Sequence, residues 1–388
     1  MTKVLFFTYA FPPINAPRSV QIARLLKHSS LKPSIVYGQG HYAEDQDLYC
    51  DYKNYVKKTI RIPFTKMDET IAKIRRKQPF DVLKHSDLFQ SWSIKAADKV
   101  IRDFDYDVVV SFGSPMSVHL GALKIKQKTN VKWVACFSDP WSDNPFEKRS
   151  PAHQRKIERY EQQVIQNADC VFFNTQETID LVMKKYDTAL LDKTKILPHS
   201  YDPDLYPKKE AKKNEKITLR YIGHFYGNRS PEPLLKALQK LPSNLLKKIK
   251  IECYGSVQPH LIDQYSDLVG TTVFFNDPVS YNDSLKLMSS ADGLLVIDAP
   301  ADQSVFLPSK LVDYIGAQKP ILGITPPGAS HRILSDLNYP VANPNDTQSI
   351  EKMIIDFVKS ENKTATKTNL FSPQSVAETL EQQITLLV

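Results

Sequence analysis

Glycine is scarce in this sequence, with 12 glycines among 388 residues, about 3% where soluble proteins average about 7%. So little glycine disfavours phosphate-binding loops built mainly of that residue. The pattern G-x-x-x-x-G-K-[ST] does not occur in the chain. This absence excludes a P-loop NTPase of the usual kind.

Metal-binding and disulfide patterns are missing as well. The four cysteines show no C-x-x-C spacing and the nine histidines no H-x-x-x-H spacing, so we expect no metal and no cofactor. No run of about 18 apolar residues predicts a membrane-spanning helix. The apolar start Val4–Phe11 is followed by Pro12, Pro13 and Arg18, so we interpret it as a strand and not as a signal peptide. We expect a cytoplasmic protein.

What is present fits a globular protein of two domains. Hydrophobic residues make up 41% and charged residues 24% of the chain, close to the averages for soluble proteins. At roughly 100–200 residues per domain, the length suggests two domains.

Strand-like runs alternate with helical patterns in both halves of the chain. In the first half we expect strands at Val4–Tyr9, Ser34–Tyr37, Thr59–Ile62, Val108–Ser111, Trp133–Phe137, Cys170–Phe173 and Lys195–Leu197, and helices at Ser19–His28, Lys84–Phe104, Ser117–Lys126, Ala152–Gln166 and Gln176–Tyr186. In the second half we expect strands at Ile217–Ile222, Lys250–Tyr254, Val273–Phe275, Gly293–Ile297 and Pro320–Ile324, and helices at Pro231–Lys240, Tyr281–Ser290, Ser309–Gly316 and from Ser372 onward. This alternation predicts an α/β fold of two doubly wound, Rossmann-like domains that face a central cleft.

A polar stretch marks the boundary between the two domains. Residues 207–216 have almost nothing to bury and are expected to form a linker. The predicted organisation is an N-terminal domain over residues 1–206, this linker, a C-terminal domain over 217–370, and a C-terminal helix over 371–388 that could pack back on the N-terminal domain.

The net charge of +8 belongs almost wholly to the first half. Residues 1–206 hold 31 basic and 24 acidic side chains, and the remainder holds 20 and 19. Nine of the basic residues lie in Lys53–Lys77, where Met67, Ile71 and Ile74 have the spacing of a narrow apolar helix stripe. This window is either a surface element attracted to anionic lipid or to a phosphate-bearing acceptor, or a solvated helix whose stripe packs on its own domain.

Two strings of the second half are candidates for binding phosphate. In Leu307–Tyr314, helix start signals place Lys310 in a first turn, where free N–H groups favour an anion. In Gly223–Arg229, glycine at a strand end allows close approach of a ligand, and Arg229 can bind phosphate oxygens with two N–H groups. Taken singly, each string is better explained by an ordinary helix cap or a surface turn.

The first half offers fewer candidates. Asp139 lies at the carboxyl end of a hydrophobic strand, where ligands bind, although an Asx-type turn also explains it. Tyr9–Arg18 joins the first strand to the first helix and would form the opposite lip of the cleft. Gly38–Ala43 matches G-x-G-x-x-A, but no convincing helix follows it, which disfavours a dinucleotide site. His119 lies inside a helical pattern and is interpreted as a packing residue.

Together these strings resemble the family-4 glycosyltransferases of the GT-B fold, in particular the bacterial branch that builds cell-surface polysaccharides. The similarity runs over most of the chain and depends on the order and spacing of its pieces. The pieces are Y-x-F-P-P near the start, Phe137–Asp143, Glu158–Asp169, Ile196–Asp202, Gly223–Pro231 and Leu307–Pro320.

The resemblance implies a retaining transfer of a sugar from a nucleotide diphosphate donor, held mainly by the second domain, to an acceptor held by the first. Arg229 and Lys310 would hold the diphosphate without a metal, Asp313 would bind the ribose, and Asp139 would face the acceptor. Asp139, Arg229 and Lys310 thus form the implied catalytic set. Further donor contacts would come from Gly223, His224, Tyr226, Gly227, Val279, Val305, Phe306 and Ser309, and the lip of the first loop from Asn15 and Ala16.

The chain departs from the family pattern at three places. The first of the family's two acidic residues, eight positions before Asp313, is Val305 here. Residues 15–17 read N-A-P where many relatives have glycines, and Ser138 stands where some members place a histidine. The sequence therefore names neither the donor sugar nor the acceptor base.

Two other functions remain open. One is a GT-B-like nucleotide-sugar epimerase or hydrolase, and the other is a basic nucleic-acid-binding protein that uses Lys53–Lys77. The favoured interpretation is a hexosyltransferase of polysaccharide biosynthesis. Its expected partners are a nucleotide sugar, a glycan or lipid-linked acceptor and, through Lys53–Lys77, an anionic membrane surface. No nucleic-acid partner is expected. Such an enzyme would be cytoplasmic and peripheral to the inner face of the cell membrane.

Overall fold

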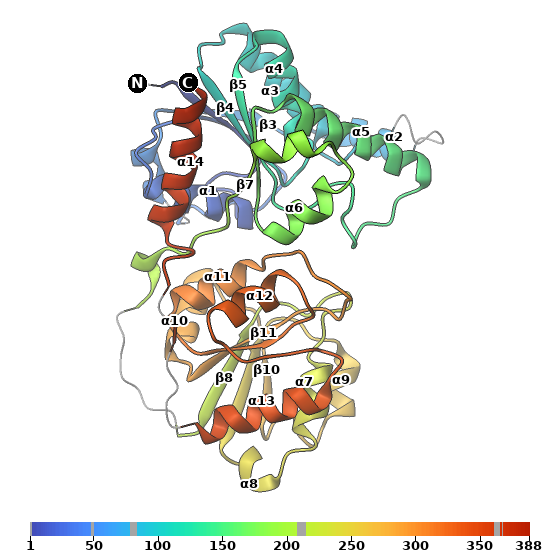
Figure 1. The fold of residues 1–388 in the computed structure, drawn as a ribbon, viewed down its shortest axis with the longest axis vertical. Helices are drawn as coiled ribbons and strands as arrows, with labels where there is room; N and C mark the ends of the chain where they lie inside the picture. The colour runs from blue at the N-terminus through green and yellow to red at the C-terminus, as the bar shows by residue number, and fades with distance from the viewer. Residues whose placement is uncertain (1, 48–49, 78–83, 208–214, 361–364, 367) are drawn as a thin grey trace. The chain divides into compact units, whose positions relative to one another are not determined.

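The computed structural model describes residues 2–47, 50–77, 84–207, 215–360, 365–366 and 368–388. The chain divides into two compact units, residues 1–200 with 373–388 and residues 201–372, and each is described by itself (Figure 1). The division falls at Ser200 and not at Tyr206, because the Tyr206 hydroxyl donates to the Asp313 carbonyl oxygen at 2.8 Å inside the second unit. Most of the predicted linker, residues 208–214, lies outside the described residues.

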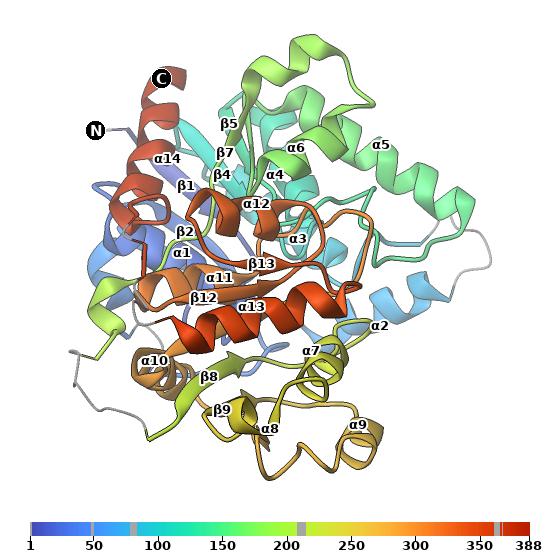
Figure 2. The same cartoon turned by 60° about the horizontal axis from the view of Figure 1, so that its bottom comes forward.

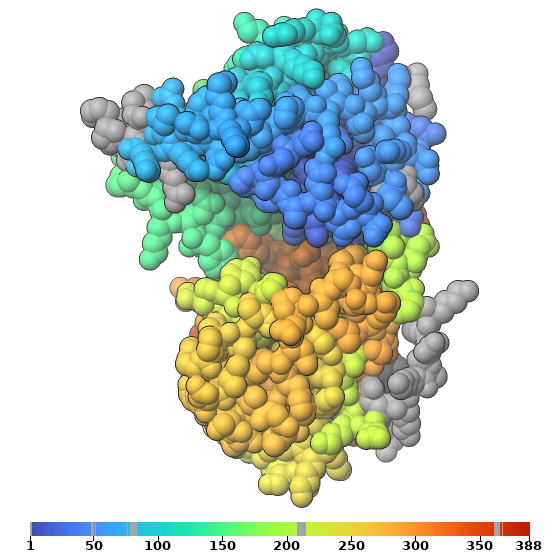
Figure 3. Space-filling view, turned by 180° about the vertical axis from the view of Figure 1, so that it is seen from behind, coloured from blue at the N-terminus to red at the C-terminus, as the bar shows by residue number. Residues whose placement is uncertain are grey.

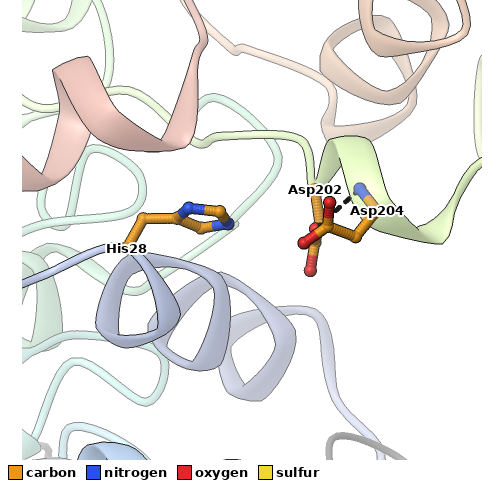
Figure 4. A group of neighbouring side chains, drawn as sticks. All are labelled: His28, Asp202 and Asp204. Carbon is orange, nitrogen blue, oxygen red and sulfur yellow. Dashed lines mark hydrogen bonds between the residues drawn. The ribbon is translucent and has the colours of Figure 1, made fainter.

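A short turn follows the division. The 3-10 helix η4 (Pro203–Leu205) begins at Asp202, whose carboxylate accepts the N–H of Asp204 at 3.1 Å (Figure 4). His28, the third residue that Figure 4 labels, belongs to the other unit.

The N-terminal unit is built on a seven-stranded parallel sheet in the order β3-β2-β1-β4-β5-β6-β7. Its strands are β1 (Val4–Phe7), β2 (Ser34–Gln39), β3 (Lys58–Pro63), β4 (Val108–Phe112), β5 (Lys132–Cys136), β6 (Cys170–Phe173) and β7 (Thr194–Ile196). The register places Phe6 of the central strand opposite Ile35 and Val110. Apolar runs such as VLFF and CVFF form these strands because both faces of a parallel sheet are buried.

Helices cover this sheet on both faces. They are α1 (Pro17–Lys27), α2 (Lys66–Arg76), α3 (Gln90–Arg102), α4 (Val118–Thr129), α5 (Pro151–Asn167) and α6 (Gln176–Met183), with 3-10 turns η1 (Cys50–Tyr55) and η3 (Thr188–Lys193). The last helix, α14 (Pro373–Leu387), lies against α1 in Figures 1 and 2 and buries Val376, Leu380 and Ile384 in the core of this unit. The end of the chain is thus part of the N-terminal unit.

The C-terminal unit has a six-stranded parallel sheet in the order β10-β9-β8-β11-β12-β13. Its strands are β8 (Ile217–Ile222), β9 (Ile249–Tyr254), β10 (Val273–Asn276), β11 (Gly293–Ile297), β12 (Ile321–Ile324) and β13 (Val341–Ala342). Its helices are α7 (Glu232–Leu238), α8 (Ser243–Leu246), α9 (Pro259–Gln264), α10 (Tyr281–Ser290), α11 (Ser309–Gly316), α12 (Ala329–Asp336) and α13 (Thr347–Lys359).

Alternate residues of β11 serve two separate cores. Leu295 and Ile297 pack in the core that α7 and α13 cover, and these two helices lie side by side in Figure 2. Leu294 and Val296 point to the other face and pack in the core shared with α10, α11 and α12. Two parallel sheets with helices on both faces confirm the predicted fold class.

Several predicted bounds were wrong. The helix expected at 84–104 is α3, which begins only at Gln90. Before it, Ser86 N–H donates to Gln90 Oε1 at 2.7 Å and Phe89 N–H to Asp87 Oδ1 at 2.9 Å. Such local side-chain acceptors compete with helical hydrogen bonds. Strand β13 and helices α12 and α13 were not predicted. No helix in the described part of the chain is long and apolar enough to cross a membrane.

Candidate nucleotide-binding site

The carboxyl end of β8 opens the loop that carries Arg229. Gly223 follows β8 with a φ of +141°, which side-chain-bearing residues rarely adopt. Its N–H donates to the Tyr254 carbonyl oxygen at 2.8 Å and aligns the loop with the end of β9. A Cβ at residue 223 would lie 2.5 Å from the Lys310 Nζ. Glycine at this position therefore leaves the space that a cation from α11 occupies.

Arg229 lies at the far end of the same loop, with a mostly buried guanidinium. Its Nη2 is 3.4 Å from Asp298 Oδ1, and its Nη1 donates to the Tyr226 hydroxyl at 3.3 Å. The Tyr226 ring lies under the guanidinium, 5.1 Å from Cζ to the ring centroid. Gln258 Nε2 fixes the backbone by donating to the Arg229 carbonyl oxygen at 3.2 Å. The buried Arg229 Nε has no partner among the described residues, so this N–H is available to an anion.

Lys310 reaches the same place from the first turn of α11. Its Nζ donates to the Tyr221 hydroxyl at 2.7 Å and lies 4.0 Å from the centroid of that ring. The pKa of Lys310 is lowered to about 7, chiefly by burial and also by the neighbouring Arg229, while Asp298 opposes the shift. Pro308 precedes the helix without a side-chain cap, so no side chain of the N-cap competes for its first N–H groups. The arrangement favours an anion.

Asp298 is a member of the site that the sequence analysis missed. It directly follows β11, and its side chain is buried at 6% exposure beside Arg229. Burial raises the pKa of Asp298, while Arg229, Ser330 and Lys310 oppose the rise. Its position at the carboxyl end of a predicted strand was a signal that the sequence did contain.

Asp313 lies one turn after Lys310 on α11 and is buried. Its Oδ1 accepts the Tyr281 hydroxyl at 3.4 Å. Tyr281, the first residue of α10, was not singled out from the sequence, because its neighbour Asp313 is 32 positions away. An acidic group held next to an aromatic hydroxyl can accept further hydrogen bonds from a diol.

The other predicted donor residues lie in the same unit and differ in exposure. His224 Nδ1 is 2.9 Å from the Ser256 hydroxyl. Gly227 has a φ of +57° and open space around it. The exposed residues are Tyr226, Val279 and Ser309. Val305 is buried and Phe306 half-buried, so the place of the family's first acidic residue is apolar here. The neighbouring Ser304 is tied to α12, since its N–H donates to the Pro327 carbonyl at 2.8 Å and its carbonyl accepts the Ala329 N–H at 2.8 Å.

The remaining predicted residues belong to the N-terminal unit. Asp139 is half-buried after β5, and burial raises its pKa, opposed by Ser138 and Arg18. Asn15 is exposed with its N–H donating to the Ala43 carbonyl at 2.8 Å, and Ala16 is the N-cap of α1. His119 is wholly buried, with Nδ1 2.8 Å from the Ser111 hydroxyl, which is a packing role.

The segment after Asp139 is held by a buried carboxylate that the sequence analysis did not single out. Glu161 Oε2 accepts the N–H groups of Trp141 and Ser142 at 3.2 and 2.9 Å. Its Oε1 accepts the Tyr186 hydroxyl at 2.9 Å and pairs with Lys185 Nζ at 2.7 Å. The F-S-D-P-W-S-D string is thus anchored by α5.

Comparisons with known proteins agree with this architecture. Residues 59–205 match the family model described as Glycosyltransferase Family 4. No curated protein sequence matches the chain significantly. HepE from Anabaena, solved in complex with UDP-glucose, is 15% identical, with 100% of this chain and 99% of that chain covered and a TM-score of 0.62.

Two further solved structures share the fold. TarM is 10% identical, with 100% of this chain and 99% of TarM covered and a TM-score of 0.67. A UDP-GlcNAc 2-epimerase from Methanocaldococcus jannaschii is 9% identical, with 99% of each chain covered and a TM-score of 0.59. At such low identity the likeness establishes the fold. The resemblance inferred from the sequence is therefore confirmed: residues 59–205 match Glycosyltransferase Family 4, in a chain whose two α/β units have the GT-B fold.

Proposed function

We propose that the protein is a retaining glycosyltransferase that moves a hexose from a nucleoside diphosphate sugar to a glycan or lipid-linked acceptor in polysaccharide biosynthesis. The observation that carries the proposal is the convergence of Arg229 and Lys310 at the carboxyl ends of β8 and β11, where α/β sheets bind ligands. The family match over residues 59–205 supports it.

The two cations and the start of α11 would bind the diphosphate and stabilise it as a leaving group. Cleavage of the sugar–phosphate bond leaves negative charge on the β-phosphate, and fixed donors in a buried site stabilise that charge more than the ground state. Arg229 supplies a planar pair of N–H groups, and Lys310 a point charge. The proposal needs no metal ion for this step.

The nucleoside would lie beside Asp313, whose carboxylate accepts hydrogen bonds from ribose hydroxyls. Val279, exposed after β10, would border the base. Because HepE was solved with UDP-glucose, UDP is the first nucleotide to test. The loop 301–306, fixed to α12 through Ser304, would present backbone groups to the sugar.

The basic window favours an acceptor on a membrane surface. Two of the three residues of the apolar stripe on helix α2 are exposed, Met67 at 69% and Ile74 at 54%, while Ile71 is half-buried. Lys66, Lys73 and Arg75 on the same helix are exposed too. This blue segment lies at the surface of the N-terminal unit in Figure 3. Exposed apolar side chains among lysines and arginines are typical of an element that binds anionic lipid, and we place the enzyme on the cytoplasmic face of the membrane.

An epimerase is the second candidate, favoured by the shared fold with the M. jannaschii enzyme. It would convert a nucleotide sugar without any acceptor, whereas a transferase consumes the donor only slowly unless an acceptor is present. NMR of the anomeric signals of donor and product, recorded with and without acceptor, separates the two activities, and the anomeric configuration of the product reports retention directly. A nucleic-acid-binding protein would instead shift RNA or DNA in a gel at physiological salt.

Calorimetric titration with UDP, GDP and ADP tests the proposed site. We expect one of these to bind, and Arg229→Ala or Lys310→Ala to weaken binding by at least tenfold, because each removes a charged hydrogen-bond donor worth about 1.5–3 kcal/mol. Arg332→Ala and Lys286→Ala, exposed residues on α12 and α10, are the matched controls. Failure of all three nucleotides to bind, or equal affinity in all four variants, would contradict the proposal.

A further inference from the structure

Asp298 lies beside Arg229, one of the two cations of the proposed diphosphate site, and interacts electrostatically with Lys310, the other. Its backbone N–H still donates to the Ile324 carbonyl at 3.0 Å, so the residue remains in register with β12 although β11 ends before it. It lies on the same face of the sheet as Leu294 and Val296, the face that α11 and α12 cover. The carboxylate therefore has little freedom to move.

Its side chain makes one ion pair and leaves one oxygen without a partner. Oδ1 lies 3.4 Å from Arg229 Nη2, whereas the buried Oδ2 has no hydrogen-bond partner within the described residues. The charged or titratable groups that face Lys310 are Arg229 from the β8 loop, Asp298 from the end of β11 and Cys253 from β9, and its Nζ donates to Tyr221 of β8. Among these groups Asp298 is the one carboxylate.

Two buried cations side by side repel each other, and each loses its hydration when buried. A carboxylate that is held in the sheet reduces both the repulsion and the cost of lost hydration. Because its single negative charge cannot neutralise two cations, the site can still attract an anion. When all three groups are ionised, the cluster of Arg229, Lys310 and Asp298 carries one net positive charge before any ligand arrives.

We propose that Asp298 is the positioning residue of the diphosphate site, which holds the Arg229 guanidinium through one oxygen and favours the ammonium form of Lys310 for the incoming diphosphate. This role rests on the proposed function of the site. Asp298 acts through the two cations and does not touch the substrate. Removing its charge should therefore change how binding depends on pH, which a purely structural residue would not do.

The test measures UDP affinity by calorimetry between pH 6 and pH 9 in wild type, Asp298→Asn, Asp298→Glu and Glu252→Gln. Glu252 is the matched control, a partly buried carboxylate of the same unit that pairs with Arg220 at 2.7 Å away from the site. We expect Asp298→Asn to move the pH at which affinity falls downward by about one unit, the size of effect that a neighbouring opposite charge has. Affinity at pH 8 then drops about tenfold. Asp298→Glu restores the wild-type midpoint, and Glu252→Gln leaves it unchanged.

A second measurement separates this inference from the proposed function. NMR of 13C-lysine-labelled protein, with Lys310 assigned through Lys310→Arg, follows the titration of Lys310 without any nucleotide. A lower midpoint in Asp298→Asn supports the role, even if no nucleoside diphosphate binds and the proposed function is wrong. Equal Lys310 midpoints in wild type and Asp298→Asn overturn the inference, as does an equal shift in Glu252→Gln. If Asp298→Asn fails to fold, Asp298→Ser is measured in the same way.

Discussion

Lys310 occupies the space that a side chain at residue 223 would need, since a Cβ on Gly223 would lie 2.5 Å from the Lys310 Nζ. Residue 223 is therefore glycine for two reasons, its positive φ and the ammonium group beside it. The second reason means that the position of the Lys310 ammonium group on α11 depends on the absence of a side chain at residue 223.

Replacing this glycine tests that connection. Gly223→Ala should displace Lys310 and weaken UDP binding about tenfold or more, measured by calorimetry. Gly270→Ala is a matched control, because residue 270 also has a positive φ but nothing lies within 4 Å of its Cβ position, and it is not one of the proposed donor contacts. Both variants lose about 1 kcal/mol of stability from the left-handed backbone. Equal UDP affinities in the two variants would show that Lys310 does not depend on residue 223.

Nucleotide binding should weaken as the pH rises above 7. The pKa of Lys310 is lowered to about 7 in the free protein, so the ammonium form is lost above that pH. A bound diphosphate favours the ammonium form, and binding at pH 8 is therefore accompanied by uptake of a proton. The second phosphate pKa lies near 6, so the change above pH 7 belongs to the protein. Calorimetry in buffers of different ionisation enthalpy measures this proton.

Lys310→Arg is the control for the pH dependence. Arginine stays charged at every pH used, so the fall in affinity between pH 7 and pH 9 should disappear and no proton should be taken up at pH 8. A variant that keeps the wild-type pH profile would place the titrating group elsewhere.

The same lowered pKa makes the protein more stable with rising pH. Between pH 7 and about 10.4, the usual lysine value, the unfolded chain binds a proton at Lys310 that the folded chain does not. The free energy of unfolding then increases with pH over this range. The pH dependence of chemical unfolding, compared between wild type and Lys310→Met, should show a smaller slope in the variant.

Glu161 should contribute strongly to the stability of the N-terminal unit. Glu161→Gln removes a buried charge that holds Lys185 and two backbone N–H groups, and breaking a buried pair costs about 3–5 kcal/mol. All three tryptophans, Trp92, Trp133 and Trp141, lie in this unit, so tryptophan fluorescence during urea unfolding measures it selectively. Glu158→Gln on the same helix should change stability by less than about 1 kcal/mol.

Charge reversal on α2 tests the membrane proposal. Arg75→Glu, Arg76→Glu and Lys77→Glu together should lower binding to vesicles that contain phosphatidylserine by about a hundredfold, at about 1 kcal/mol for each basic residue lost. Lys236→Glu with Lys240→Glu, exposed in the C-terminal unit, is the control. Unchanged vesicle binding in the triple variant would show that these three basic residues have no lipid role.

The alternation of apolar runs with helical patterns was enough to predict two parallel α/β sheets. The reason is that parallel strands such as Val108–Phe112 are buried on both faces and stand out as continuous apolar runs. The strings around Gly223, Arg229 and Lys310 also predicted two cations that the structure brings close together, although each string taken singly is better explained by an ordinary cap or turn. Short or partly polar elements, such as β13 and α12, gave no such signal.

Only the tertiary structure showed which partners these residues have. Asp298 and Arg229 are 69 positions apart, and Tyr281 and Asp313 are 32 apart, so neither pair follows a local spacing rule. The exposure of the apolar stripe on α2 was also visible only in the fold. Sequence periodicity predicts that apolar residues share one face of a helix, but it does not predict whether that face is exposed or buried. The sequence by itself determined the fold class and the charges of the site; packing between distant segments decided their burial, their pairing and the lowered pKa of Lys310.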